Sequence, residues 1–151
     1  YDSYSYEHFL SRFRGIMIAT RQIADELAAI IPPETCTGFL SKTKLGEQTV
    51  LSEELFLFDE RHLIHVDYYL ELSPESHKNN AKMSIFRWSN FRSVHVELTD
   101  FRSVSFQTIS ITLMTDFGQA VTISNSHHNF NQPPEVVKQF YVDLRRFLLT
   151  L

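Results

Sequence analysis

The sequence predicts an α+β fold, in which one helix precedes and another follows a run of about seven antiparallel strands. Apolar residues recur at steps of three and four over residues 6–31 and again after Pro133, as in amphipathic helices. Between these segments, apolar residues recur at every second position, as in strands with one buried face. No strand–helix alternation interrupts that middle part, which disfavours a parallel sheet.

The first segment predicts a single long amphipathic helix over residues 6–31. Its apolar stripe consists of Phe9, Phe13, Ile16, Thr20, Ile23, Leu27 and Ile30 or Ile31. Ser3 or Ser5 can cap its start, because a serine oxygen accepts a hydrogen bond from a free backbone N–H there. Pro32 and Pro33 end it, because proline cannot donate to the helical ladder. We expect this helix to pack on the domain body or on a partner chain.

The middle of the chain predicts strands separated by polar turns. The strands are expected over residues 35–42, 50–58, 62–72, 82–88, 94–98, 109–113 and 121–123. Charged residues at 59–61 and the segment 116–119 are typical of hairpin turns. In the fifth strand the alternation predicts that Val94 and Val96 point inward.

The end of the chain predicts a second amphipathic helix. Pro133, Pro134 and Glu135 suit its start, because proline fits the first turn and glutamate favours the positive helix end. Its apolar stripe consists of Val136 or Val137, Phe140, Leu144, Phe147 or Leu148, and Leu151.

Four segments of this order resemble bacterial pleckstrin-homology-like (PH-like) domains. They read LFLFDERHLIHVD, RWSNFRSVHVEL, ISITLMTDFGQAVTI and PPEVVKQFYVDLRRFL, and the resemblance covers about residues 35–151. It implies a seven-stranded antiparallel barrel or sandwich with a C-terminal capping helix. We therefore expect a PH-like domain over 34–151, preceded by an added N-terminal helix within 1–33.

Composition excludes several classes of protein. The chain of 151 residues suggests one domain, and its net charge of −4 disfavours a nucleic-acid binder. Cys36 is the single cysteine, which excludes an intrachain disulfide and fits a reducing cytoplasm. No apolar run approaches the roughly 20 residues of a membrane span. The chain begins at Tyr1 rather than Met, so a trimmed targeting segment stays an open alternative.

The pattern H-x-x-H-x-D at His62, His65 and Asp67 invites a metal-site interpretation. On a regular strand His62 faces away from His65 and Asp67. The two remaining ligands are too few for a structural zinc ion, which usually has four. We expect no metal site.

A polar row at Ser93, His95 and Glu97 invites a catalytic interpretation. Same-face neighbours on a strand lie roughly 7 Å apart, too far for the hydrogen bonds of a nucleophile and its base. The chain contains only 4 glycines and no glycine-rich phosphate-binding motif. We expect no catalytic residues and no cofactor.

The function that we expect is a non-enzymatic protein-binding or self-assembly module in a bacterial or phage cytoplasm. Its aromatic-rich N-terminus is typical of a contact surface, and a lone tryptophan at a strand end is either a core residue, which we favour, or an interface anchor. The candidate contact residues are Tyr4, Tyr6, Phe9 and Trp88, with a protein partner or a second copy as the ligand.

An alternative is a module that binds phosphate or an anionic lipid headgroup through peripheral membrane contact. In eukaryotic PH relatives that bind inositol phosphates, a basic cluster flanks the first hairpin. The matching candidates are Lys42, Lys44, Lys78 and Lys82, although Glu47 lies among them. An uncharacterised enzyme is the remaining and least favoured alternative.

Overall fold

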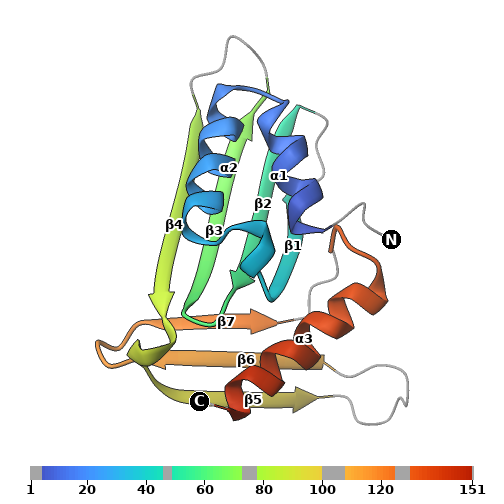
Figure 1. The fold of residues 1–151 in the computed structure, drawn as a ribbon. Coiled ribbons are helices and arrows are strands. Elements are labelled where there is room, and N and C mark those ends of the chain that lie inside the picture. The colour runs from blue at the N-terminus through green and yellow to red at the C-terminus, as the bar shows by residue number, and fades with distance from the viewer. Residues whose placement is uncertain (1–4, 46–48, 73–77, 100–107, 125–129, 151) are drawn as a thin grey trace. The chain divides into compact units, whose positions relative to one another are not determined.

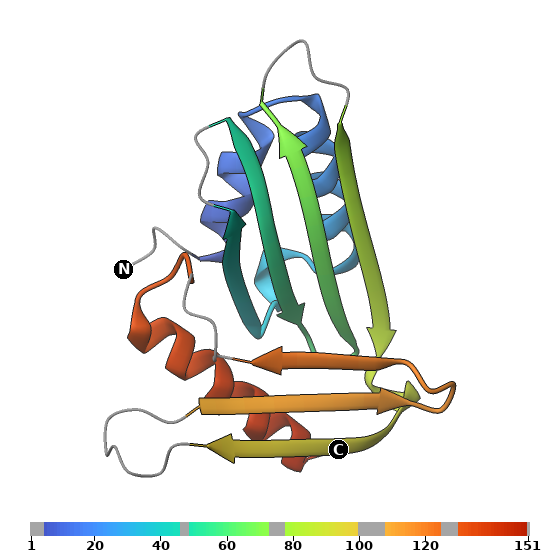
Figure 2. The same cartoon turned by 180° about the vertical axis from the view of Figure 1, so that it is seen from behind.

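The computed structural model describes residues 5–45, 49–72, 78–99, 108–124 and 130–150 (Figures 1 and 2). It confirms the α+β class and the antiparallel strands. The chain forms two compact units, one combining the described parts of 1–85 and 129–151, the other lying within 86–128. The seven described strands form separate sheets of four and three strands and do not make a closed barrel.

The predicted single helix over 6–31 is wrong, because the structure has two helices there. Helix α1 spans Tyr6–Arg14 and helix α2 spans Ile18–Ile30. Gly15 ends α1 by donating its N–H to the Arg12 carbonyl at 3.1 Å. Met17 is extended, with φ −160° and ψ 174°, and it starts α2. The apolar spacing did not reveal the break, because both helices bury residues of the same periodic stripe.

The first unit contains a four-stranded sheet in the order β1-β2-β3-β4. Its strands are β1 (Gly38–Leu45), β2 (Val50–Phe58), β3 (His62–Glu71) and β4 (Asn79–Arg87), and the short 3₁₀ helix η1 (Pro33–Thr35) precedes β1. The predicted charged turn between β2 and β3 is confirmed. One Asp59 carboxylate oxygen accepts from the N–H groups of Arg61 at 2.8 Å and His62 at 2.6 Å.

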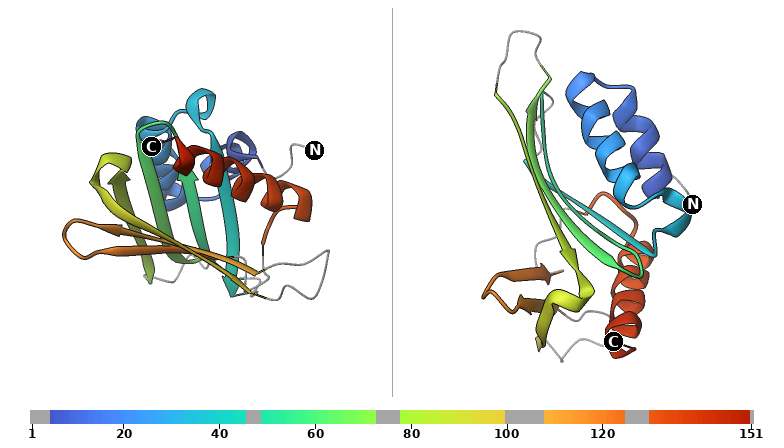
Figure 3. Two further views of the ribbon diagram at one scale, coloured as in Figure 1. Left: turned by 90° about the horizontal axis from the view of Figure 1, so that it is seen from below. Right: turned by 60° about the vertical axis from the view of Figure 1, so that its left-hand side comes forward.

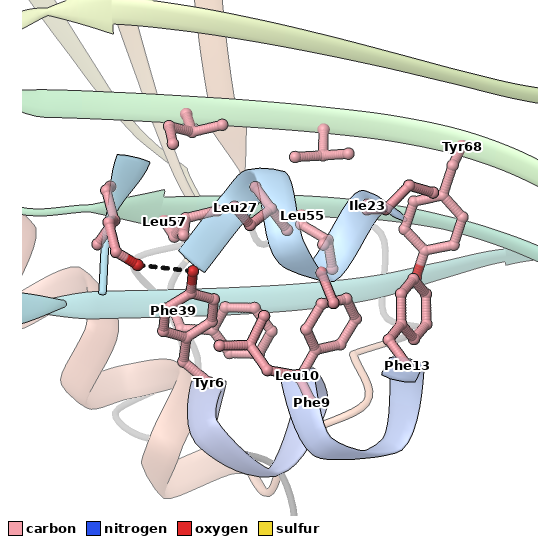
Figure 4. Close-up of a cluster of buried hydrophobic side chains, with 14 of the residues drawn as sticks. Tyr6, Phe9, Leu10, Phe13, Ile23, Leu27, Phe39, Leu55, Leu57 and Tyr68 are labelled. Carbon is pink, nitrogen blue, oxygen red and sulfur yellow. Dashed lines mark hydrogen bonds between the residues drawn. The ribbon is translucent and has the colours of Figure 1, made fainter. Parts of the chain in front are cut away.

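Helices α1 and α2 cover one face of this sheet, so the N-terminal segment packs on its own chain (Figure 3). Register places Leu57 opposite Ile64, Leu55 opposite Val66 and Glu53 opposite Tyr68 on that face. Aromatic rings join the helices to the sheet, with Phe13 and Tyr68 centroids 5.2 Å apart and Phe9 and Phe39 centroids 5.3 Å apart (Figure 4). This contact is the main core of the first unit.

Helix α3 (Pro134–Leu149) and the segment before it return to strand β1. The Asn131 N–H donates to the Ser41 carbonyl at 2.9 Å. The Gln132 side chain accepts from the Ser41 N–H and donates to the Phe39 carbonyl, both at 2.9 Å. These bonds satisfy backbone groups that an outer strand would otherwise leave unpaired. They join the segment before α3 to strand β1.

The second unit contains strands β5 (Phe91–Thr99), β6 (Thr108–Thr115) and β7 (Ala120–Ser124), preceded by the 3₁₀ helix η2 (Trp88–Asn90). The predicted turn at 116–119 is confirmed, and Gly118 supplies its positive φ of 80°. Val94 and Val96 share the face of the buried residues of this sheet, as the alternation predicts, but they are still 44% and 42% exposed. Both lie on an outer strand of this sheet, whereas their partners Leu113 and Ile111 on central β6 are buried.

Within the described ranges, no helix combines the length and the apolar character that crossing a membrane requires.

Candidate functional site

A groove of about 800 Å³ lies in the first unit, between the start of α1, the η1 turn and α3. We call it the α1–α3 groove. Its lining residues are Ser5, Tyr6, Glu7, His8, Ser11, Pro33, Cys36, Thr37, Gly38, Phe39, Gln132, Glu135, Val136, Gln139, Phe140 and Asp143. The volume falls within the roughly 300–1,000 Å³ that is typical of ligand-binding clefts.

Buried aromatic residues form the apolar lining of the groove together with the half-buried Pro33 and Val136. Tyr6, Phe39 and Phe140 are each less than 10% exposed. The Tyr6 hydroxyl donates to the Ile31 carbonyl at 2.8 Å, which fixes the ring beside Phe39 (Figure 4). The Tyr6 and Phe39 centroids are 5.4 Å apart. The apolar surface is therefore held in place before any partner binds, which lowers the entropy cost of binding.

Cys36 lies half-buried in the wall of the groove. Its Sγ donates to the Gly38 carbonyl at 3.3 Å. Burial raises the pKa of this thiol to about 12. A thiol with such a pKa stays protonated near neutral pH, so it is a poor nucleophile.

Acidic side chains supply the charge of the groove. Glu7 comes from α1, while Glu135 and Asp143 come from α3. Glu7 and Glu135 are exposed, and Asp143 is half-buried and accepts from Gln139 Nε2 at 2.9 Å. None of the described residues that line the groove is lysine or arginine.

A second hollow of about 360 Å³ adjoins the groove, since it shares His8 and Phe39 with it. Its cation is Arg12, which lies over the rings of Phe9 and Phe13. Arg12 also approaches Glu53 at 3.6 Å.

Buried Glu53 is the centre of a polar network behind this hollow. Its carboxylate accepts from the Tyr68 hydroxyl and from Asn131 Nδ2, the latter at 2.6 Å. The same Asn131 nitrogen donates to Ser41 Oγ at 2.7 Å. Desolvation, followed by the Glu53 charge, raises the pKa of Tyr68. The network joins β1, β2, β3 and the segment before α3, so its role is to hold the first unit together.

The predicted anion-binding lysines on β1 lie on the sheet face opposite α1 and α2. Lys44 Nζ is 2.6 Å from an Asp67 carboxylate oxygen. The Lys42 ammonium lies 5.2 Å from the ring centre of Phe130. Burial lowers the pKa of Lys42, while the Glu54 charge opposes that change. Both cations therefore have a carboxylate beside them.

The other two predicted lysines lie elsewhere on the sheet. Lys82 is exposed on β4, and Lys78 directly precedes that strand. Because β1 and β4 are the two outer strands, the structure does not bring all of the candidate anion-binding lysines together.

The residues of the H-x-x-H-x-D pattern have different partners. His65 Nε2 lies 2.8 Å from a Glu54 carboxylate oxygen and Asp67 pairs with Lys44, whereas His62 lies beside the Asp59 turn. The hydrogen bond from His65 is the main reason that the pKa of Glu54 is lowered.

The candidate contact residues are largely buried. Tyr6 and Phe9 belong to the core between α1 and the sheet, and Tyr6 also lines the groove. Trp88 is 4% exposed and packs on Phe91 within the second unit, with ring centroids 5.7 Å apart. Tyr4 lies outside the described residues.

Sequence reasoning did not find the groove, although one signal pointed toward it. Glu7 and Glu135 each stand in the first turn of a helix. Nothing in their spacing indicates that the starts of α1 and α3 converge.

Comparison of the chain with protein-family models, curated proteins and solved structures finds no match. The functional argument therefore rests on the residues of this chain.

Proposed function

We propose that this chain is a non-enzymatic protein-binding module, and that the α1–α3 groove receives a peptide segment of a partner protein. The observation that carries the proposal is the pairing of a preformed apolar lining with an acidic rim in one groove. Binding clefts combine a mostly apolar wall with a few placed polar groups in this way. The groove is built from helices, a turn and a strand of one compact unit, so its shape does not depend on the second unit.

The resemblance to PH-like domains is part of this proposal. A four-stranded sheet, a three-stranded sheet and a final helix follow one another along the chain, and this order supports the resemblance. We do not extend the proposal to anionic headgroups, because Glu54 and Asp67 lie beside Lys42 and Lys44. The protonated Cys36 thiol supports a binding role for the groove over covalent catalysis.

A peptide-display selection tests the proposal. The immobilised chain is offered a library of random peptides, and enriched peptides are compared on two tryptophan variants. Gln139→Trp places a large side chain in the groove wall, whereas Gln22→Trp makes the same exchange at an exposed position of α2. The tryptophan of Gln139→Trp occupies space that the peptide needs. We therefore expect enriched peptides to bind the wild type and Gln22→Trp but not Gln139→Trp.

Selection of no peptide, or of peptides that bind Gln139→Trp as well as the wild type, would contradict a peptide-binding groove. Light scattering on the same samples shows whether a second copy is the occupant.

A further inference from the structure

We infer that the occupant of the α1–α3 groove is an extended segment with Lys or Arg at two positions four residues apart and an apolar residue midway between them. This inference rests on the proposed function and names the chemistry of its partner. The net charge of the groove, the spacing of its carboxylates and the position of its apolar surface together favour such a segment.

The net charge of the groove is negative even after the helix ends are counted. Helices α1 and α3 both start at the groove, and each positive helix end is worth roughly half a charge. The two ends together offset about one of the carboxylates of Glu7, Glu135 and Asp143. Asp143 lies well inside α3, so neutralising a helix end does not account for it.

The carboxylates are spread along the groove. Within the described ranges, no group of three or more His, Cys, Asp or Glu side chains could hold a metal ion. Glu135 and Asp143 lie on α3 at positions separated by roughly 12 Å of helix rise. An extended chain covers that distance in about four residues. One segment can therefore bring a cation to each carboxylate.

The apolar surface fixes the residue between the two cations. In an extended segment, residues i, i+2 and i+4 point to the same side. Tyr6, Phe39 and Phe140 line the groove and would receive the middle residue. Arginine suits the flanking positions, because its guanidinium group pairs bidentately with carboxylates and also stacks on aromatic rings. An acidic segment would meet like charges and would be rejected.

Three capped synthetic peptides of equal length test the inference. The first carries the order Lys-Ser-Leu-Ser-Lys between serines. The second has the same composition, with its two lysines adjacent, and the third has Glu in place of Lys. Fluorescence anisotropy measures the binding of each peptide to the intact chain. We expect the first peptide to bind about fivefold more tightly than the second, because adjacent lysines can reach only one of the two carboxylates at a time.

Matched charge variants identify where the peptide binds. Glu135→Gln combined with Asp143→Asn removes the groove charges, whereas Glu26→Gln combined with Glu97→Gln removes two exposed charges elsewhere. We expect the groove pair to weaken binding of the first peptide about tenfold and the control pair to leave it unchanged. Raising the salt concentration should weaken the wild-type complex, because salt screens exposed charges.

Two results would overturn the inference. One is equal binding of the first two peptides to the wild type, and the other is equal weakening by the two charge variants. The display selection separates this failure from failure of the proposed function. Selected peptides that require the groove but carry acidic or neutral residues would support the proposed peptide-binding function and contradict the inferred basic partner.

Discussion

At the scale of single residues, Gly38 has a steric role at the start of β1. A Cβ atom built at this position would lie 2.1 Å from Cε1 of Phe58. Phe58 is fully buried, so its ring cannot move without disturbing the core. We expect Gly38→Ala to lower the free energy of unfolding by about 1–3 kcal/mol, as overpacking does in other cores. Urea-induced unfolding followed by circular dichroism measures the change.

Gly15→Ala is the matched control for this substitution. The nearest atom to a Cβ at Gly15 is the Arg12 carbonyl oxygen at 3.6 Å, an ordinary contact. Its φ of −96° is accessible to alanine. We expect Gly15→Ala to leave stability unchanged or to raise it by about 0.4–1 kcal/mol. Equal stability of Gly38→Ala and Gly15→Ala would show that the Phe58 ring adjusts at no cost.

At the scale of elements, Thr20 joins the two N-terminal helices. It is fully buried, and its Oγ1 accepts from the Met17 N–H at 3.0 Å and lies 2.6 Å from the Phe13 carbonyl oxygen. Thr20→Val keeps the shape but leaves these buried groups without their partner. We expect a loss of about 1–3 kcal/mol of unfolding free energy, the cost of leaving buried polar groups unsatisfied.

Thr20→Ser removes the methyl group at this junction and keeps the hydroxyl, so it distinguishes the contribution of packing from that of hydrogen bonding. The serine oxygen can make the same hydrogen bonds, so we expect Thr20→Ser to be more stable than Thr20→Val. Thermal unfolding of both variants gives the comparison. The opposite order would mean that packing of the methyl group, rather than hydrogen bonding, holds α1 against α2.

The junction between α1 and α2 explains why the sequence predicts one helix where the structure has two. Ile16 and Thr20 fit the apolar period of one long helix. In the structure Ile16 is 38% exposed and Thr20 is a capping side chain. Apolar periodicity indicates only which residues face the core. Two helices packed side by side on one sheet therefore show the same periodicity as one long helix.

At the scale of the whole molecule, the described strands differ in how well they are protected. Strand β2 lies between β1 and β3, and its residues Leu55 to Phe58 are nearly fully buried. Strand β4 is an outer strand with mostly exposed residues. Amide hydrogens exchange slowly where opening requires disruption of the core. We therefore expect the slowest exchange in β2 and β3 and faster exchange in β4, as measured by mass spectrometry.

Exchange in β1 tests a further point about the same sheet. Asn131 and Gln132 bond to Ser41 and Phe39 along β1. We expect the Ser41 amide to be protected although β1 is also an outer strand. Fast exchange at Ser41, or protection of β4 equal to that of β2, would contradict this account of the sheet.

Much of the architecture could be predicted from the sequence, because periodicity is a local property of the chain. The strand from Val50 to Phe58, the alternating burial from Ile64 to Glu71 and the turn at Asp59 are all found in the structure. Parity placed His65 and Asp67 on one face, and the register agrees. These features depend only on the alternating faces of a strand and on short-range hydrogen bonding.

The residues of the candidate site come together only in the tertiary structure. Glu7 and Asp143 lie near opposite ends of the chain, and only the folding of α1 and α3 around β1 brings them into one groove. Packing likewise decided that Tyr6 and Phe9 are core residues and that Lys44 meets Asp67. The sequence by itself determined the class of fold and the faces of its strands. The long-range contacts that make the groove have no periodic signature, so only the tertiary structure could reveal them.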